Sequence, residues 1–327
     1  MDILNPRSLR DDAQRALARG RDPKKLIYTY AGISIGLSLL VTLLNLWLEQ
    51  EISGTGGLSN LGTRAIFSTA QQAAPLLAGI LSMCLDLGYL SGMMRIARGQ
   101  YADHTDLKVG LQKFWPLMRL TILQYLIYLA LGFFAVQLGT IIFTMTPWAE
   151  PAMEMLMAMS TVDPMTLTEA DLLRMMSELV PMYIIAGILY ILILIPFLYK
   201  LRFAHFCLLD DSSGRALAAI RTSSKLMRRK FLPMLKVDLS LWYYYAGIVV
   251  SMLVMYADLV LLALGIELPM DAQVFSLLVY GISLLLQFVI QVNLRNRAEA
   301  VYLTAYDRLR EKPKEGGPVT LGNIFDM

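Results

Sequence analysis

The chain has 327 residues, of which 56% are hydrophobic and only 17% are charged, and its formal net charge at pH 7 is +3. Soluble domains usually carry about a quarter charged residues, so this composition, with a mean hydropathy of +0.53, excludes an ordinary soluble globular protein. The apolar residues also come in runs of roughly 20, the length of a helix that crosses a lipid bilayer. The sequence therefore predicts a polytopic membrane protein.

The first predicted element is a short N-terminal helix. Asn5-Pro6 is typical of a helix start, and apolar residues then recur at helical spacing along one face, at Leu9, Ala13, Ala16 and Leu17. We expect residues 1–25 to form a cytoplasmic amphipathic helix at the membrane surface. We expect no cleavable signal peptide, because the first apolar run is too long for one and no small-residue cleavage site follows it.

Six apolar runs follow, and each is long enough for a transmembrane helix. They are residues 26–48, 73–94, 117–145, 181–203, 236–262 and 273–294. Backbone groups cannot remain unpaired in hydrocarbon, so such runs form helices rather than strands. We predict an all-α membrane domain over residues 26–310, with a Met-rich outer loop at 146–180 and a disordered cytoplasmic tail at 311–327.

The positions of the basic residues predict the orientation of these spans. If the N-terminus is cytoplasmic, only Arg64 and Arg174 of the 29 Lys and Arg residues fall on the outer side. Cytoplasmic loops of membrane proteins carry an excess of Lys and Arg. Both termini are therefore expected in the cytoplasm.

A short sequence occurs twice, just before the third and the fifth predicted spans. KFWPLMRL begins at Lys113 and KFLPMLKV begins at Lys230. A basic amphipathic stretch precedes each copy, and such a helix suits the headgroup layer of a membrane. The apolar face is Leu107, Leu111 and Phe114 before the first copy, and Leu217, Ile220, Ser224, Met227 and Phe231 around the second.

Proline is tolerated in the first turn of a helix, so each repeated junction reads as the start of a new span. Together with the N-terminal helix, the junctions predict three parallel units, each an interfacial amphipathic helix followed by a hairpin of two spans. The alternative is that the two junctions are alike only because cytoplasmic loops that enter a membrane share this composition.

The basic residues around the second junction are candidates for contact with anionic lipid of the inner leaflet. They are Arg215, Arg221, Lys225, Arg228, Arg229 and Lys230. Their charge could also attract nucleic acid, but lipid headgroups are the nearer partner, and we expect no nucleic-acid binding.

Small-residue pairs predict how the first two spans pack. Gly32 and Gly36 form one small-xxx-small pattern, and Gly88 and Gly92 form another. Because the two spans are antiparallel, the pairs should lie at similar depth, where glycines allow close backbone approach.

Asp86 is the strongest candidate for a polar site inside the membrane. It lies nine residues before Arg95, about 13 Å along a helix, and an ionisable group at that depth is costly. Candidate partners at similar height are Lys200, Arg202 and Lys236, and Asp238 lies near Lys236. The site is either a structural ion pair or part of a transport pathway.

Features that would indicate an enzyme or a cofactor are sparse. His104 and His205 are the only histidines, and neither joins a Cys or carboxylate cluster with metal-ligand spacing,. There is no nucleophile elbow, phosphate loop or HExxH pattern. Methionines alternate from Met153 to Met159 and could suit Cu(I), but that spacing does not place them on one helical face. We expect no catalytic residue, metal or cofactor.

The stretch AAIRTSSKLMRRKFLPMLKVDLSLW at 218–242 resembles the signature of a bacterial membrane family, domain of unknown function 975. The matching positions are Ser224, Lys225, Leu226 and Met227, then Leu239, Ser240 and Trp242. GYLSGMMRIARG at 88–99, DLKVGLQKF at 106–114 and the ending AEAVYLTAYDRL are also similar. The resemblance implies a multi-pass protein of the bacterial cytoplasmic membrane, and it implies no particular reaction.

These features favour a non-enzymatic accessory or scaffold protein that engages membrane lipid or another membrane protein through its inner-leaflet helices. The alternative is a small-solute transporter or permease with a pathway near Asp86. The two differ in what the substitution Asp86→Asn should do. A transporter should lose activity with its fold intact, whereas a structural pair should lose stability.

Overall fold

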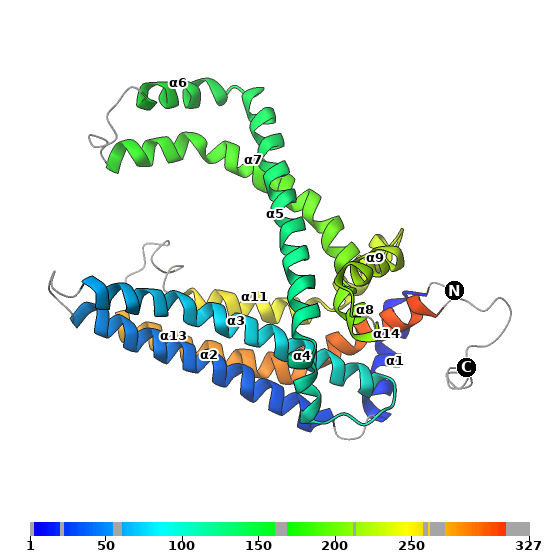
Figure 1. Ribbon diagram of the computed structural model, residues 1–327. Coiled ribbons are helices and arrows are strands. Elements are labelled where there is room, and N and C mark those ends of the chain that lie inside the picture. The colour runs from blue at the N-terminus through cyan, green and yellow to red at the C-terminus, as the bar shows by residue number, and fades with distance from the viewer. Residues whose placement is uncertain are drawn as a thin grey trace. The chain divides into compact units, whose positions relative to one another are not determined.

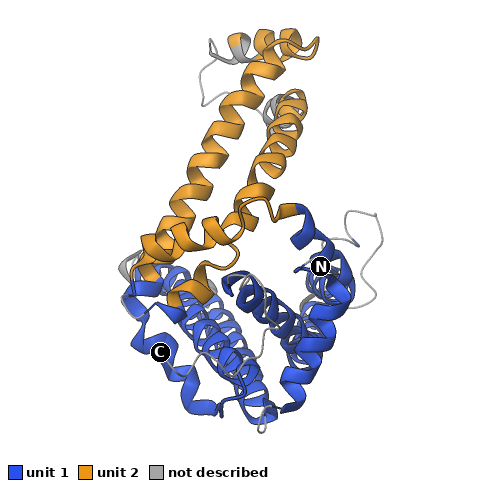
Figure 2. Ribbon diagram, turned by 90° about the vertical axis from the view of Figure 1, so that its right-hand side faces the viewer, with its two compact units in different colours: residues 1–117, 209–214, 232–327 blue, residues 118–208, 215–231 orange. Residues whose placement is uncertain are grey.

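The computed structural model describes residues 3–19, 23–54, 61–160, 169–211, 214–257, 261 and 272–311. Every regular element within these ranges is a helix (Figure 1), which confirms the predicted all-α class. The chain divides into two compact units (Figure 2). Unit 1 comprises residues 1–117, 209–214 and 232–327, and unit 2 comprises residues 118–208 and 215–231.

Five helices are long and apolar enough to cross a membrane, so the prediction of a multi-pass membrane protein is confirmed. Large apolar side chains point outward along them, as expected of surfaces that face lipid: Leu40, Leu76 and Leu285 are each 60% exposed or more. The five are built on α2 (Pro23–Gly54), α3 (Leu61–Ala97), α5 (Phe114–Thr144), α7 (Glu169–Leu201) and α13 (Ala272–Val289).

The fifth predicted span, residues 236–262, is not one straight helix. The structure has α10 (Phe231–Ser240) and α11 (Trp242–Met255), bent by 67° at the break between them. The Ser240 hydroxyl donates to the Val237 carbonyl at 2.7 Å, and the Leu241 amide bonds to the Asp238 carbonyl at 2.9 Å. These local bonds replace the helical pattern and turn the chain. Residues 258–260 and 262 of this predicted span lie outside the described residues.

The sixth predicted span does not end at residue 294. After α13 the chain makes a π-helical turn, η4 (Ile290–Arg295), and continues as α14 (Asn296–Arg310). Polar residues around the turn lower the hydropathy there, which is why the sequence predicted an end. The helix persists because α14 buries one face, including Val301, Tyr302 and Tyr306, in contacts with α1 and α3.

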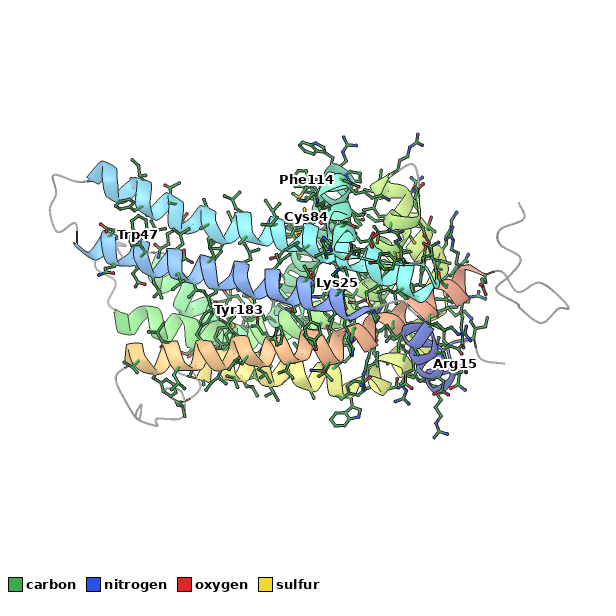
Figure 3. The ribbon with its side chains drawn as sticks, turned by 90° about the horizontal axis from the view of Figure 1, so that it is seen from below. Arg15, Lys25, Trp47, Cys84, Phe114 and Tyr183 are labelled. Carbon is green, nitrogen blue, oxygen red and sulfur yellow. The ribbon has the colours of Figure 1, made fainter. Side chains whose placement is uncertain are left out.

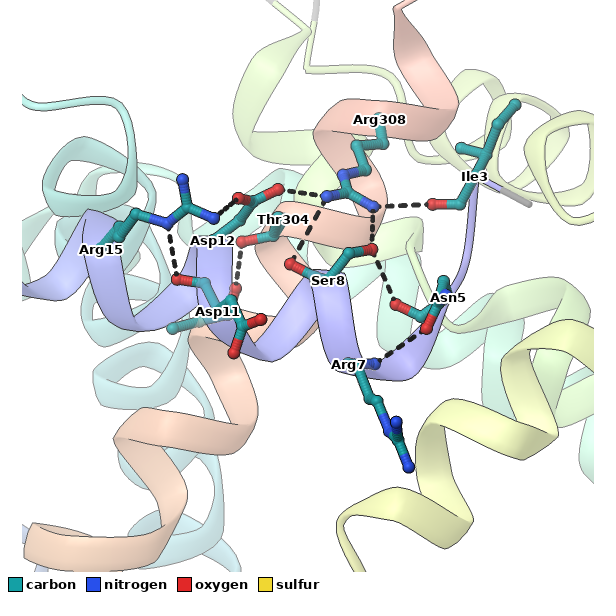
Figure 4. A network of polar contacts seen from close by, with 10 residues as sticks. Ile3, Asn5, Arg7, Ser8, Asp11, Asp12, Arg15, Thr304 and Arg308 are labelled. Carbon is teal, nitrogen blue, oxygen red and sulfur yellow. Dashed lines mark hydrogen bonds and ion pairs between the residues drawn. The ribbon is translucent and has the colours of Figure 1, made fainter. Parts of the chain in front are cut away.

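The N-terminal helix α1 (Pro6–Arg19) packs on α14 instead of presenting its apolar face to lipid. Leu9 and Ala13 are buried. Arg308 of α14 donates to the Ile3 carbonyl and the Ser8 hydroxyl, at 3.0 Å each, and pairs with Asp12 (Figure 4). The protein itself thus covers Leu9 and Ala13 of the predicted apolar face, whereas Ala16 and Leu17 are only half-buried.

The second predicted interfacial helix is short and also packs on protein. It consists of a 3₁₀ turn, η2 (His104–Leu107), and α4 (Lys108–Gln112), both in contact with α3. Arg95 at the end of α3 pairs with Asp106 at 2.6 Å. Cys84, Leu87 and Leu117 form a small hydrophobic core, and Phe114 packs against it (Figure 3).

In unit 2, α6 (Ala149–Ser160) lies beside the first part of α7 (Figure 1). Phe143, Ala149 and Ala152 pack with Leu179, Met182 and Ile185. The predicted Met-rich loop 146–180 is therefore largely helical on either side of residues 161–168, which lie outside the described residues. Met153 and Met157 are exposed on α6.

At the other end of α7, the chain continues through α8 (Ala204–Asp210) and α9 (Ala216–Leu226), and α9 packs on α7. The buried face of α9 is Ala216, Ala219 and Ser223, whereas Leu217 of the predicted apolar face is 57% exposed. Small residues let helix backbones approach closely, which explains why they, and not the larger apolar residues, face α7.

Ser223 fastens α9 to the corner between α7 and α8. Its hydroxyl donates to the Lys200 carbonyl at 2.8 Å and accepts from the Phe203 amide at 3.1 Å. Helix ends leave carbonyl groups without intrahelical partners, and Ser223 supplies one for this end.

Ser223→Ala should lower the free energy of unfolding by about 1–3 kcal/mol, because it removes two hydrogen bonds to backbone groups at a buried position. The measurement is equilibrium unfolding by SDS titration in mixed micelles. Thr222→Ala, on the exposed side of the same helix, is the matched control and should change stability little. Equal losses in the two variants would contradict the assigned role.

Candidate functional site

Asp86 of α3 and Arg295 of η4 form an ion pair between two of the candidate spans. Arg295 Nη2 lies 2.9 Å from Asp86 Oδ1. The Tyr30 hydroxyl, from α2, donates to the same oxygen, and Arg295 Nη1 donates to that hydroxyl at 2.5 Å. The three residues come from three different helices, so the contact cross-links α2, α3 and the α13–α14 helix.

Aromatic rings enclose the guanidinium. The Arg295 guanidinium carbon lies 4.9 Å from the ring centre of Tyr30 and 5.1 Å from that of Tyr89. Glu299, one turn further along, places Oε1 3.9 Å from Arg295 Nε. The Arg295 side chain is 19% exposed and that of Asp86 is 43% exposed. Arginine stacks on aromatic faces and pairs with carboxylates at once, which lysine does less well.

Arg295 closes the π-helical turn η4. Such a turn inserts a residue into an α-helix and occurs often at functional sites. Gln291, in the same turn, donates to the Ser34 hydroxyl at 3.4 Å and adds a second polar link to α2. The turn therefore presents two polar side chains toward α2 while the helix continues on both sides.

The chemistry open to this pair is narrow. A guanidinium does not lose its proton in proteins, so any proton transfer through this pair would have to use the Asp86 carboxylate. Its Oδ1 is already bound by Tyr30 and Arg295. The arrangement is better suited to holding three helices together than to reversible proton transfer.

The structure gives Asp86 a partner that was not among those predicted. Lys236 is exposed on α10, and the ion pair of Asp86 is with Arg295. Lys200 lies over the Phe197 ring at 4.7 Å, and Arg202 lies over the Tyr199 ring at 5.5 Å.

Asp238 is buried elsewhere in unit 1. Its carboxylate accepts a hydrogen bond from the Tyr302 hydroxyl at 3.0 Å. The Tyr302 hydroxyl in turn lies 2.7 Å from the Tyr245 hydroxyl. Asp86 and Asp238 therefore have different hydrogen-bond donors, Tyr30 and Arg295 for Asp86 and Tyr302 for Asp238.

Sequence reasoning missed Arg295 because it placed that residue just outside the sixth span. One signal could have found it. Tyr30, Asp86 and Arg295 each lie within about ten residues of the predicted cytoplasmic end of a span. Their depths along the helices are therefore comparable.

The glycine prediction is half wrong. A Cβ atom on Gly32 or Gly36 would meet nothing within 4 Å, so neither forms a notch for α3. On α3, Gly92 faces the Leu26 side chain of α2, whereas Gly88 faces the backbone of Leu107. Gly88 thus serves contact with η2 and not with α2.

A second charged cluster joins the end of α3 to α8 and α14. Arg98 binds both carboxylate oxygens of Asp210, at 2.7 and 2.9 Å, and reaches Asp307 at 2.8 Å. Arg310 also bonds to Asp210 at 2.5 Å, and the Tyr306 hydroxyl donates to it at 3.0 Å. The hydrogen bonds with Asp210 and then with Asp307 raise the pKa of Arg98 above its usual value. These residues all belong to unit 1, so the cluster links the end of α3, Asp210 and α14 within that unit.

The basic segment, residues 215–230, behaves differently from these paired arginines. Its six cations make no ion pair with any residue that the structure describes, and five of them are exposed: Arg215, Arg221, Lys225, Arg228 and Arg229. Lys230 is half-buried. No acidic residue occurs between positions 214 and 230. Within the described chain, the positive charges of this segment therefore follow one another without a neutralising carboxylate.

Comparison of the chain with known protein families, with curated proteins and with solved structures found no match.

Proposed function

We propose that the protein is a non-enzymatic accessory or scaffold protein of the bacterial cytoplasmic membrane that engages anionic lipid of the inner leaflet. The observation that supports this is the contrast between two groups of cations. Arg95, Arg98, Arg295 and Arg308 are bound to carboxylates within the protein. Those of the basic segment make no ion pair with described residues, and five of the six are exposed. Such clusters beside a membrane helix attract anionic headgroups.

The proposal includes a topology. Both termini lie in the cytoplasm, which places the basic segment at the inner leaflet, in keeping with the excess of Lys and Arg on that side. The chain is built from three parallel units, each with a pair of spans, and it resembles domain of unknown function 975 through the motif at 218–242. Another membrane protein is the alternative partner for the same basic segment.

The test is thermal unfolding of the purified full chain in detergent, with added phosphatidylglycerol or with added phosphatidylcholine. We expect phosphatidylglycerol to raise Tm by about 5 °C more than phosphatidylcholine does, because only the native state presents the cations together. Changing Arg215, Arg221, Lys225 and Arg228 to Gln should remove the difference.

The matched control changes four exposed bases near the N-terminus, Arg7, Arg19, Lys24 and Lys25, to Gln. It should keep the preference for phosphatidylglycerol. Equal stabilisation of the unmodified chain by both lipids would refute the engagement of anionic lipid, and native mass spectra of the protein released from its own membrane would then be searched for a second polypeptide.

A small-solute transporter with a pathway near Asp86 is the second candidate function. The observation that favours it is the π-helical turn that carries Arg295, because such turns recur at functional sites,. The occupied Asp86 oxygen argues for a structural role, and the stability of the Asp86→Asn variant separates the two.

A further inference from the structure

A pocket of about 380 Å³ opens in unit 2, where the end of α7 meets α9 and the turn that follows it. Its lining comes from α7, α9, the turn after α9 and the first residue of α10. The part of the lining that carries the argument is Tyr199, Lys200, Lys225, Arg228, Arg229 and Phe231. The pocket is therefore built at the junction of a candidate membrane span with the basic segment.

Four of the residues that line this pocket are cations, and none is acidic. Lys200, Lys225, Arg228 and Arg229 make no ion pair with the residues that the structure describes. Lys200 instead lies over the Phe197 ring, 4.7 Å from its centre. A cleft lined by charges of one sign concentrates counter-ions, so this composition favours an anion inside it.

The backbone at the pocket departs from ordinary geometry. Arg229 has a φ of 60° and is the one non-glycine residue with positive φ in the described chain. This left-handed conformation costs free energy for a residue with a Cβ atom. Such departures cluster at ligand-binding positions, and here the turn places Arg228 and Arg229, adjacent in sequence, at the same pocket.

The walls of the pocket are held in place before any ligand arrives. Ser223 bonds to the carbonyl of Lys200 at 2.8 Å, which ties the α9 wall to the α7 wall. The rings of Tyr199 and Phe231 meet edge to face with centres 4.8 Å apart, and Met227 is buried beneath the turn. A site fixed in this way loses little conformational entropy when it binds.

We propose that this pocket binds a phosphate group of an anionic lipid headgroup. Guanidinium and ammonium groups together suit phosphate, which accepts several charge-assisted hydrogen bonds. The apolar surface of α7 continues from the pocket along the candidate span, where Ile191 and Leu192 are exposed, and provides a path for the acyl chains. The inference rests on the proposed function and deepens it, because it replaces a diffuse basic surface with one stoichiometric site.

The experiment is native mass spectrometry of the full chain in detergent, titrated with phosphatidylglycerol and, separately, with phosphatidylcholine. The pocket variant is Lys225→Gln with Arg229→Gln. The matched control is Arg215→Gln with Arg221→Gln, two unpaired exposed bases of the same segment that do not line the pocket. We expect the unmodified chain and the control each to retain one phosphatidylglycerol molecule tightly. The pocket variant should bind phosphatidylglycerol at least about tenfold more weakly than the unmodified chain.

A further variant, Arg229→Gly, separates loss of folding from loss of binding. Glycine adopts positive φ without strain, so this variant should unfold at the same or a higher temperature while it retains less phosphatidylglycerol. If it bound the lipid as tightly as the unmodified chain, Arg229 would not be part of the site.

The remaining outcomes distinguish the possible failures. Equal weakening in the pocket variant and the control would overturn the pocket and leave the proposed lipid engagement standing. Equal retention of both lipids by the unmodified chain would overturn the proposed function as well. A parallel experiment adds inorganic phosphate as a competitor. If the protein bound phosphate through Lys225 and Arg229 but retained no lipid, the natural ligand would be a soluble phosphate compound. That result would overturn the assignment to lipid.

Discussion

Gly110→Ala is expected to lower the free energy of unfolding by about 2–3 kcal/mol, the upper range for overpacking a close contact. A Cβ atom at this position would press on the carbonyl of Cys84. It would lie 2.6 Å from the carbonyl carbon of Cys84 and 3.1 Å from the Cα atom of Cys84. These are backbone atoms of α3, so no side-chain rotation can make room. The measurement is equilibrium unfolding by SDS titration in mixed micelles.

Gly88→Ala tests the same contact from the other side. Its Cβ would meet the backbone of Leu107, with Cα at 2.6 Å, and a similar loss of stability is expected. Gly36→Ala is the control, because nothing lies within 4 Å of its Cβ position, and Ala in a helix should leave stability unchanged or raise it by up to about 1 kcal/mol. A loss at Gly36 equal to that at Gly88 would restore the packing predicted from the small-residue pattern.

The existence of most spans could be predicted from hydropathy alone. Residues 26–48, 73–94 and 181–203 fall within α2, α3 and the α7–α8 segment, because an apolar run of that length has no other stable form in lipid. Helix ends were harder to place, since polar residues continue each helix beyond its apolar run. The bend at Leu241 depends on a serine hydroxyl that bonds back to a carbonyl, which hydropathy does not report.

Helical periodicity predicted an apolar face of α9 turned toward the membrane, and Leu217 of that face is outward. It did not predict which residues of α9 contact protein. In water, the large apolar side chains of a helix turn toward the core. In lipid there is no such drive between helices, and small residues are favoured where two backbones meet. Ala216, Ala219 and Ser223 are accordingly buried, whereas Leu217 is left outward. The small-residue pattern likewise assigned Gly88 to a helix contact, but its contact is with the Leu107 backbone and not with α2.

Some features of the charged residues could be predicted from the sequence and others could not. The cost of an ionisable group inside a span was enough to single out Asp86. Its partner depended on how far the last helix continues and on the π-helical turn at its centre, which neither composition nor spacing reveals. The unpaired charge of the basic segment, in contrast, was visible in the sequence, because no acidic residue lies within it.

Arg295→Gln is expected to lower the free energy of unfolding by about 3 kcal/mol, the low end of the scale for breaking a buried ion pair, because Arg295 is largely buried and Asp86 is only partly so. It removes the charge that faces Asp86 and the bonds that join α2, α3 and η4. Arg297→Gln is the matched control two residues away, because Arg297 is exposed, and it should change stability by less than about 0.5 kcal/mol.

Asp86→Asn should cost less than Arg295→Gln, since the Asp86 side chain is 43% exposed and the amide oxygen can still accept from Tyr30. Combining the two substitutions tests whether they act on one contact. If Asp86 and Arg295 form a structural cross-link, the double variant should lose less stability than the sum of the single losses, by about 1–2 kcal/mol. Additive losses, or an Asp86→Asn variant with unchanged stability that fails to move a solute across proteoliposomes, would instead assign Asp86 to a transport pathway and overturn the accessory role.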